Sequence, residues 1–312
     1  MFQVGKKRVL SICFVGIVFG CGGIVAYKWA YMRPIATMQL FISRGHTPVI
    51  EFLPDPHPRY VLIDTGQESP LCLKQSLMKD LSLRATDKTR HSFTVLGEVQ
   101  NRVFRLESLD VQGLHFENVE VDEKEKNMKI EGLSFLCHVA HPHMKYEGSI
   151  GMGLLGQYNF LLDFDRFALI LYRKGVLVRS LWENSHVKIP LISNALPIID
   201  LDTPYGRKRF LIDTGATVSL IAEELFVDFA PDILDDGTVK SIQLPLSCEG
   251  TSLGVLKCFF MKMSIKNLEA DGILGLDFLH RYRLFFDNRH HYLYLMEYPE
   301  KTKNMIYTER KK

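Results

Sequence analysis

Short runs of apolar residues, many of them alternating with polar ones, recur along the chain beyond its first 35 residues. They are rich in β-branched and aromatic residues and are separated by turn-forming residues, which is typical of β-strands. The pattern predicts strands at Val49–Leu53, Arg59–Ile63, Phe93–Gly97, Val103–Val111, Leu114–Val121, Phe160–Phe164, Ala168–Arg173, Leu196–Leu201, Arg209–Ile212, Val239–Leu244, Leu253–Ile265, Leu284–Asp287 and Tyr292–Met296. Many short strands and little helix predict a mainly β fold with barrel-like lobes.

Helical patterns are few and short. Helices are predicted at Leu73–Leu81 and Ala222–Phe229, and a further pair is expected directly after Gly151 and Gly275. Each predicted helix of one half therefore has a counterpart in the other half, which indicates an internal repeat.

Two aligned blocks establish this repeat. Leu62-Ile63-Asp64-Thr65-Gly66 recurs as Leu211-Ile212-Asp213-Thr214-Gly215, and Ser149-Ile150-Gly151 corresponds to Ile273-Leu274-Gly275. The aspartates are 149 residues apart and the glycines that end the second blocks are 124 apart, so the first half carries 25 extra residues. We expect them within Asn101–Tyr146, where the charged run 122–126 is typical of a solvated turn. A given tripeptide of this kind is expected only ~0.1 times in a chain of this length, so coincidence is a poor explanation.

The paired blocks resemble those of the aspartic peptidases of the pepsin and retropepsin group, over roughly residues 37–297. In that family each of two lobes supplies an Asp-Thr-Gly loop, and a later apolar-apolar-Gly block packs behind it. The resemblance implies a bilobal acid-protease fold built from two fused retropepsin-like lobes, with catalytic Asp64 and Asp213 and no cofactor. Ala216-Thr217 after the second motif is usual for the family, whereas Gln67-Glu68 after the first is not, and the tyrosine of the pepsin flap is not identifiable.

The chemistry of paired carboxyls suits peptide hydrolysis without a metal. Two carboxyls about 3 Å apart cannot both ionise easily, so the pair holds one proton, as is known for aspartic proteases. The ionised member would take a proton from water, and the protonated member would polarise the scissile carbonyl. Gly66 and Gly215 would let backbone N–H groups approach the carboxyls. The hydroxyls of Thr65 and Thr214 would bond across the lobe junction.

Two functions stay open at this point. The first is an endopeptidase that binds an extended peptide or protein substrate beneath one flap or two, with candidates at Thr94–Arg102 around Gly97 and at Pro245–Gly254 around Gly250. The second is a catalytically inactive, membrane-anchored binding or assembly protein on the same fold. Glu68 is its main support, because a further negative charge beside the first aspartate could disturb the shared proton. The presence of both aspartates favours the enzyme.

The N-terminal segment predicts attachment to a membrane. Val9–Tyr27 is a 19-residue run without a charged residue, long enough to cross a hydrocarbon core of about 30 Å. It follows Lys6-Lys7-Arg8, which favours a cytoplasmic N-terminus. A lipoprotein site at Cys21 and a cleaved signal peptide are the alternatives. All three place the lobes outside the cytoplasm, and a bacterial inner membrane facing the periplasm is the expected location.

Composition adds the domain outline and excludes one class of partner. With 312 residues, 46% of them hydrophobic, the chain can bury one or two large cores. The net charge of +2 gives no indication of nucleic-acid binding. The predicted parts are a cytoplasmic stub and transmembrane anchor (1–35), a first lobe (36–182), a second lobe (183–298) and a charged tail (299–312). Because one chain supplies both lobes, a monomer is expected.

Cysteine and histidine residues complete the candidate chemistry. Among the cysteines beyond the N-terminal segment, Cys248 and Cys258 flank a predicted hairpin and are the favoured disulfide pair, with free buried thiols at these two, Cys72 and Cys137 as the alternative. The cluster around Cys137-His138 matches no standard zinc spacing, so no metal site is predicted.

Overall fold

The computed structural model describes residues 33–42, 47–53, 58–94, 97–124, 146–174, 185–193, 195–225, 234–235, 240–261 and 269–298. The predicted anchor, the charged tail and the cluster around Cys137-His138 lie outside the described residues. Within the described part, no helix has the length and apolar character needed to cross a membrane.

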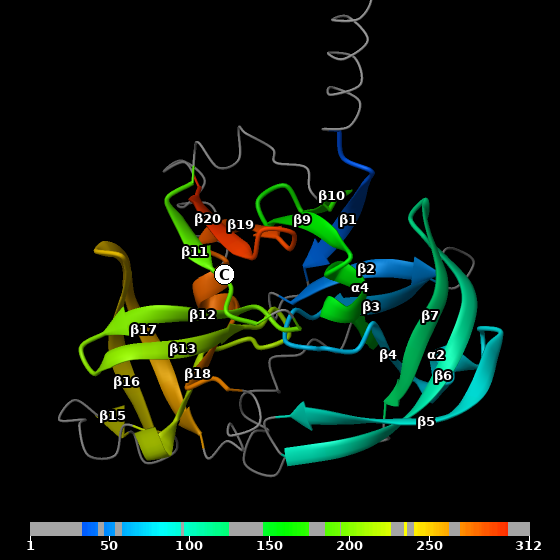
Figure 1. Ribbon diagram of the computed structural model, residues 1–312, viewed down its shortest axis with the longest axis horizontal. Coiled ribbons are helices and arrows are strands. Elements are labelled where there is room, and N and C mark those ends of the chain that lie inside the picture. The colour runs from blue at the N-terminus through cyan, green and yellow to red at the C-terminus, as the bar shows by residue number, and fades with distance from the viewer. Residues whose placement is uncertain are drawn as a thin grey trace, which may run out of the picture.

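The described residues of the first half of the chain form ten strands and two short helices (Figure 1). They are β1 (Ala36–Ile42), β2 (Pro48–Leu53), β3 (Arg59–Ile63), β4 (Leu71–Lys74), α2 (Gln75–Met78), β5 (Leu83–Thr94), β6 (Gly97–Val111), β7 (Leu114–Lys124), β8 (Tyr146–Ile150), α4 (Met152–Leu155), β9 (Tyr158–Asp163) and β10 (Ala168–Arg173).

The second half repeats this pattern with shorter outer strands. Its elements are β11 (Val187–Pro190), β12 (Ile198–Thr203), β13 (Gly206–Ile212), β14 (Leu220–Ala222), the 3-10 turn η1 (Glu223–Leu225), β15 (Leu234–Asp235), β16 (Lys240–Cys248), β17 (Thr251–Met261), β18 (Gly272–Leu274), α6 (Leu276–Leu279), β19 (Tyr282–Asp287) and β20 (Tyr292–Glu297). The prediction of a mainly β, bilobal fold is therefore confirmed.

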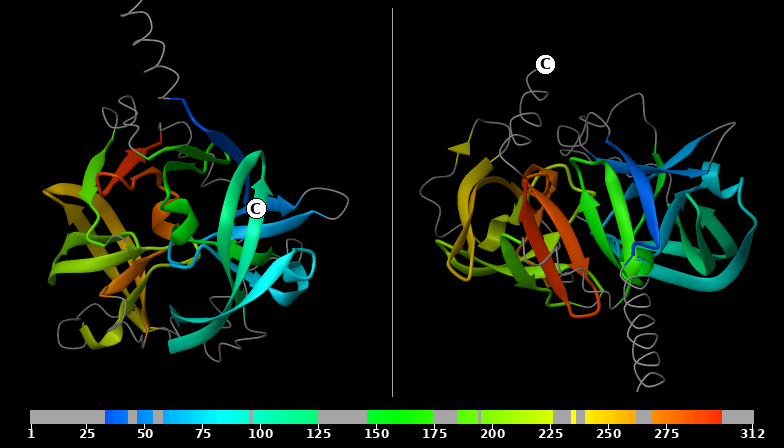
Figure 2. Two further views of the ribbon diagram at one scale, coloured as in Figure 1. Left: turned by 45° about the vertical axis from the view of Figure 1, so that its right-hand side comes forward. Right: turned by 90° about the horizontal axis from the view of Figure 1, so that it is seen from above.

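Two sheets carry the lobes. One has the order β11-β20-β19-β9-β10-β1-β2-β3-β8-β4-β7-β6-β5, and the other has the order β12-β13-β18-β14-β17-β16-β15. The last two strands of the chain return to the first sheet, where Leu284 of β19 is paired with Leu162 of β9. The lobes are thus joined through a shared platform of strands, seen between them in Figures 1 and 2.

The internal repeat is visible in the strand pairing. In the first lobe β3 runs parallel to β8, and Ile63 is paired with Ile150; in the second lobe β13 runs parallel to β18, and Ile212 is paired with Leu274. All four side chains are buried. Each strand that leads to an Asp-Thr-Gly tripeptide is therefore held by the apolar block that follows much later in the same half.

The 25 extra residues of the first lobe occur in two places, not in one. Leu71 of β4 is paired with Val121, 50 residues later, whereas its counterpart Leu220 of β14 is paired with Phe259, 39 residues later. Eleven extra residues thus lie before the end of β7, where β5 and β6 form a long hairpin, and the other 14 lie between β7 and β8. The prediction that confined them to Asn101–Tyr146 was therefore only partly right.

Several predicted elements differ in type or length. The helix predicted at Leu73–Leu81 is reduced to α2, because the chain first forms β4 against β7 and β8. Ala222 ends β14, and η1 takes the place of the start of the helix predicted at Ala222–Phe229. The strand predicted at Phe93–Gly97 covers only the end of β5 and the first residue of β6. The rest of β5 was missed because it is a mostly exposed edge strand without apolar alternation. The helices expected after Gly151 and Gly275 are present as α4 and α6.

The predicted disulfide between Cys248 and Cys258 is wrong, because Cys72, Cys248 and Cys258 are free thiols. Cys248 and Cys258 belong to the β16–β17 hairpin, but Cys248 is paired with Thr251 near the tip and Cys258 is paired with Ile242. Because Ile242 and Cys248 are six positions apart on β16, the two cysteines are separated by about 20 Å along the hairpin. Burial raises the pKa of the Cys258 thiol, so it behaves as an inert core residue.

Candidate active site at the lobe junction

Each aspartate of the repeat stands at the end of a buried strand. Asp64 follows β3 and its N–H donates to Ile150 O at 2.9 Å; Asp213 follows β13 and its N–H donates to Leu274 O at 3.0 Å. These bonds extend the parallel pairing by one residue. The backbone of each aspartate is therefore fixed by the second block of its own lobe.

The two threonines hold the loops together across the junction. The N–H of Thr65 donates to Thr214 Oγ1, and the N–H of Thr214 donates to Thr65 Oγ1, both at 3.1 Å. Each hydroxyl then donates to the other lobe, Thr65 to Ile212 O at 2.8 Å and Thr214 to Ile63 O at 2.6 Å. Both threonines are fully buried. At about 1 kcal/mol each, these four bonds favour one relative position of the two loops.

Gly66 and Gly215 allow each loop to lie against the opposite carboxyl. A Cβ atom at Gly66 would fall 2.5 Å from Asp213 Cγ, and one at Gly215 would fall 2.8 Å from Asp64 Cγ. No side chain can occupy these positions without displacing a carboxyl. The reciprocal contacts show that the two aspartates lie in one site at the junction.

The two carboxyls are close enough for each to influence the ionisation of the other, so they titrate as a pair. Burial, followed by the negative charge of Asp213, raises the pKa of Asp64 well above its usual range, although Lys124 opposes the rise. Burial also raises the pKa of Asp213, against the hydrogen bonds that it accepts.

Backbone donors explain why the two carboxyls differ. The N–H of Gly66 donates to Asp64 Oδ1 at 3.1 Å. Asp213 Oδ1 accepts two such bonds, from Gly215 at 2.7 Å and from Ala216 at 3.2 Å. Hydrogen bonds to a carboxylate favour its charged form, so the negative charge is better stabilised on Asp213.

Gln67 and Glu68, the departures from the family pattern, have different surroundings. The Nε2 of Gln67 donates to Ser69 O at 3.0 Å, and its Oε1 accepts a bond from the Ser149 hydroxyl. Gln67 therefore ties the first loop to β8. The side chain of Glu68 is exposed, and only its backbone oxygen is engaged, by the N–H of Gly153 at 2.9 Å. This exposure removes the main support for an inactive protein.

The two flap candidates lie in different surroundings. Gly97 is paired with Thr94 at the end of the β5–β6 hairpin, which reaches from the first lobe toward the second (Figure 1 and the left view of Figure 2). Gly250 lies at the tip of the β16–β17 hairpin. Next to it, Leu253 O accepts a bond from the Tyr282 hydroxyl at 3.4 Å, on the side of β19. The structure therefore does not bring Gly250 to the two carboxyls.

Sequence patterns missed two acids near the Asp-Thr-Gly loops, one of them buried and the other half-buried. Asp122, in the run predicted to be a solvated turn, is fully buried on β7. Asp277 of α6 accepts bonds from the hydroxyl of Ser219 at 2.6 Å and from its N–H at 3.1 Å. The burial of Asp122 could not be predicted because its sequence neighbours are charged. Asp277 could have been noticed from its position two residues after Gly275. Among the described residues, no group of histidine, cysteine and acidic side chains could hold a metal ion.

Comparison with known proteins identifies the architecture. No protein-family model matches the chain, and no curated protein matches it. Among solved structures, the aspartic proteinase from Irpex lacteus superposes with a TM-score of 0.56 and 15% sequence identity, over 84% of this chain and 97% of that chain. The fold is that of a pepsin-like aspartic proteinase. At this identity the pepsin-like likeness concerns the fold alone, so the chemistry has to be inferred from the residues at the lobe junction.

Proposed function

We propose that this protein is an aspartic endopeptidase in which Asp64 and Asp213 activate a water molecule for attack on a peptide bond. The observation that carries the proposal is the pair of carboxyls brought together at the junction, each pressed against the glycine of the opposite loop. A turn with a merely structural aspartate would need neither the partner carboxyl nor a shared proton.

The polarity of the pair assigns a role to each member. Asp213, the better stabilised anion, takes a proton from the attacking water. Asp64, whose raised pKa keeps it protonated, donates a hydrogen bond and then its proton to the oxygen of the scissile carbonyl. The resulting diol collapses when the leaving nitrogen receives a proton from the pair, and the peptide bond breaks.

The experiment is cleavage of a quenched peptide with an apolar centre by wild type, Asp64→Asn, Asp213→Asn and the double variant. Each single variant should lower kcat/KM at least about a thousandfold, because it removes the acid or the base. The double variant should be no worse, because the pair acts as a unit. Asp80→Asn is the matched control, since Asp80 is an exposed partner of Arg59 away from the junction.

Turnover by Asp213→Asn close to that of wild type would contradict the proposal. So would loss of wild-type activity on adding a metal chelator, since the proposed chemistry uses no metal. Peptide binding by wild type without cleavage would instead favour the inactive binding protein.

The substrate is proposed to be an extended peptide segment with apolar side chains beside the cleaved bond. Strands that lead to the aspartates are apolar, and an extended peptide can add to a β-hairpin by backbone hydrogen bonds. Only the β5–β6 hairpin is in position to cover such a peptide among the described elements, so we propose one flap rather than two.

Membrane attachment through Val9–Tyr27 stays a prediction that the sequence alone supports. It would place the lobes outside the cytoplasm, as a monomer held at the membrane surface. A reporter fused after Lys312 that works only outside the cytoplasm should be active. An active cytoplasmic reporter at the same position would contradict this topology.

A further inference from the structure

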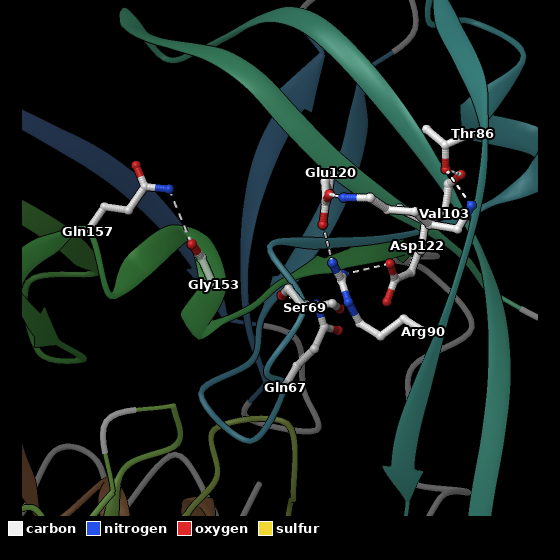
Figure 3. A network of polar contacts seen from close by, with 10 residues as sticks. Gln67, Ser69, Thr86, Arg90, Val103, Glu120, Asp122, Gly153 and Gln157 are labelled. Carbon is white, nitrogen blue, oxygen red and sulfur yellow. Dashed lines mark hydrogen bonds and ion pairs between the residues drawn. The ribbon is translucent and has the colours of Figure 1, made fainter.

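A charged cluster ties the outer edge of the first lobe to its inner strands (Figure 3). Arg90 of β5 contacts two carboxylates of β7. Its Nη1 donates to Asp122 Oδ1 at 2.7 Å, and its Nη2 donates to Glu120. β6 lies between these strands, because Arg90 is paired with Asn101 and Asp122 with Val103. The guanidinium therefore reaches across the whole of β6.

Asp122 depends on this contact. It has no exposed surface, and burial raises its pKa while Arg90 opposes the rise. Its Oδ2 has no hydrogen-bond partner of good geometry among the described residues, although the Ser69 hydroxyl is close enough to favour the charged form. Burying a carboxylate is costly without a counter-ion, so Arg90 is what keeps Asp122 charged inside the lobe.

Ser69 connects this cluster to the loop that carries Asp64. The backbone oxygen of Ser69 accepts the bond from Gln67, and Gln67 is bonded in turn to Ser149 of β8. Asp122 is also opposite Cys72 in the parallel pairing of β7 with β4, which begins just after this loop. The pairing of β7 with β4 thus joins Asp122, and through it Arg90, to the strand that begins just after the Asp64 loop; Gln67, Ser69, Arg90 and Asp122 are labelled in Figure 3.

Among the described side chains of β5 that contact β7, that of Arg90 lies nearest the tip of the hairpin. Lys88, two residues earlier on β5, donates to Glu120 at 2.9 Å. Beyond Arg90, the described side chains of β5 reach β6 only: Ser92 accepts a bond from Asn101 at 3.0 Å. From Arg90 to its tip the hairpin is a two-stranded ribbon, which is marginally stable without further support.

We propose that Arg90 is a positioning residue that fixes the base from which the β5–β6 hairpin extends, and thereby holds its tip at the distance from Asp64 and Asp213 that an extended peptide requires. The role of the hairpin tip rests on the proposed function, whereas the structural link from Arg90 to Asp122 and Glu120 does not depend on it. The second lobe has no equivalent within its described residues, because its corresponding strand, β15, spans only Leu234–Asp235.

The test compares amide hydrogen exchange in four proteins without any peptide: wild type, Arg90→Met, Arg90→Met/Asp122→Asn and the control Arg84→Met. The double variant is included because Arg90→Met alone leaves a buried carboxylate without its counter-ion. Arg84 lies on the same strand and pairs with Glu107 at 2.6 Å, but both side chains are exposed, 76% and 59%. In both Arg90 variants, exchange in residues 88–104 should be at least tenfold faster than in wild type, whereas exchange in β16–β17 should be unchanged. In Arg84→Met, the β5–β6 hairpin should exchange at the wild-type rate.

Kinetics on the apolar-centred peptide gives the second readout. A mispositioned hairpin weakens substrate and transition-state binding alike, so the double variant should raise KM at least fivefold and change kcat less than twofold. Arg90→Lys, which can hold one carboxylate, should recover part of the KM.

Three results would overturn the proposal: hairpin exchange equal to that of Arg84→Met, equally fast exchange in both lobes, or a lowered kcat with unchanged KM, which is what partial unfolding gives. If wild type cleaves nothing, hydrolysis by the dyad is wrong. The exchange data, collected without substrate, then decide whether Arg90 ties the hairpin to the loop.

Discussion

The two lobes present their aspartates in the same way but support the following loops differently. In the first lobe the support comes from backbone bonds, from Gly153 N–H to Glu68 O and from Gly151 N–H to Pro70 O at 2.9 and 3.0 Å, and from the Gln67 side chain, which accepts a bond from Ser149. In the second lobe Leu276 N–H donates to Ala216 O at 2.8 Å, and the side-chain support comes from Ser219, whose Oγ accepts a bond from Gly275 N–H at 3.0 Å and donates to Asp277.

The outer strands differ even more. The first lobe extends β5 over 12 residues and fixes it with charged side chains, whereas the corresponding β15 has two residues. The two lobes therefore have the same structure at the junction, where their symmetry brings two carboxyls together, and different structures at their outer edges. On the proposed function the lobes have separate tasks: both contribute a carboxyl to the proposed dyad, and the β5–β6 hairpin of the first lobe covers it.

The largest expected effect comes from breaking the symmetric junction at its glycines. Gly66→Ala and Gly215→Ala each place a methyl group inside van der Waals distance of the opposite carboxyl, so both should lower kcat/KM at least about a hundredfold. Gly66→Ala should be the worse, because its contact is 2.5 Å rather than 2.8 Å. The measurement is peptide cleavage together with thermal unfolding. Gly113→Ala lies at a hairpin tip with open space around it but at a φ of +84°, so it shows what backbone strain from an alanine away from the junction does to stability and activity. Activity above a tenth of wild type in either junction variant would refute the close approach.

A second prediction tests whether the lobes contribute equally to the junction. Thr65→Val and Thr214→Val each remove a hydroxyl that makes one bond as donor and one as acceptor, leaving a buried N–H and C=O unpaired. Each should lower the free energy of unfolding by about 2–4 kcal/mol, and by similar amounts. Urea titration measures this. Thr203→Val, on an exposed turn of the second lobe, is the control. A large difference between the two junction variants would mean that one lobe dominates.

A third prediction separates the two carboxyls through the pH dependence of stability. The pKa of Asp64 is raised in the folded protein, whereas in the unfolded chain it is near 3.9. Its stabilising contribution is therefore complete below about pH 4 and falls as the pH rises toward the folded pKa, by about 1.4 kcal/mol for each pH unit that separates the folded from the unfolded pKa. Asp64→Asn lacks this loss, so its melting temperature should rise relative to wild type between pH 4 and 7. Asp213→Asn should show a smaller rise, because backbone donors stabilise that anion. Equal pH dependence in wild type and Asp64→Asn would be the contrary result.

The smallest expected effect concerns Glu68. Activity should follow a bell-shaped pH profile, because the working pair carries one proton, and its upper limb should lie above the usual carboxyl range. Glu68→Ala should leave both limbs within about 0.3 pH units of wild type, since the side chain is exposed and its charge is screened. Gln67→Leu, which removes the bonds to Ser69 and Ser149, should disturb activity more. A clear acid shift of the upper limb in Glu68→Ala would show that Glu68 acts on the dyad.

The sequence predicts an element correctly where its local pattern of apolar residues matches the contacts that the element makes in the fold. The buried strands before Asp64 and Asp213 are continuous apolar runs, so both the strands and their repetition could be predicted, and the repeat placed the two aspartates together. Most of β5 was missed because an exposed edge strand needs no apolar face, and its stability comes from partners on β6 and β7.

The charged cluster was missed for a related reason. Asp122 lies among acidic and basic neighbours that indicate a solvated turn, and its burial depends on Arg90, 32 residues earlier. The disulfide prediction failed because two cysteines in one hairpin are close only if the strand register pairs them. Here the register places Cys248 near the tip and Cys258 far along the other strand.

The return of β19 and β20 to the first sheet has a consequence for the order of events when the chain is made. β9 pairs with β10 soon after both are made, but its other neighbour, β19, is absent until Leu284 has been synthesised, more than a hundred residues after Leu162. A ribosome adding 5–20 residues per second takes on the order of 10 s over that interval. During it, the β19-facing edge of β9 is open to other chains. The strands that join the two halves are thus made after every other described strand, so the platform shared by the lobes is the last part of the described fold to be completed.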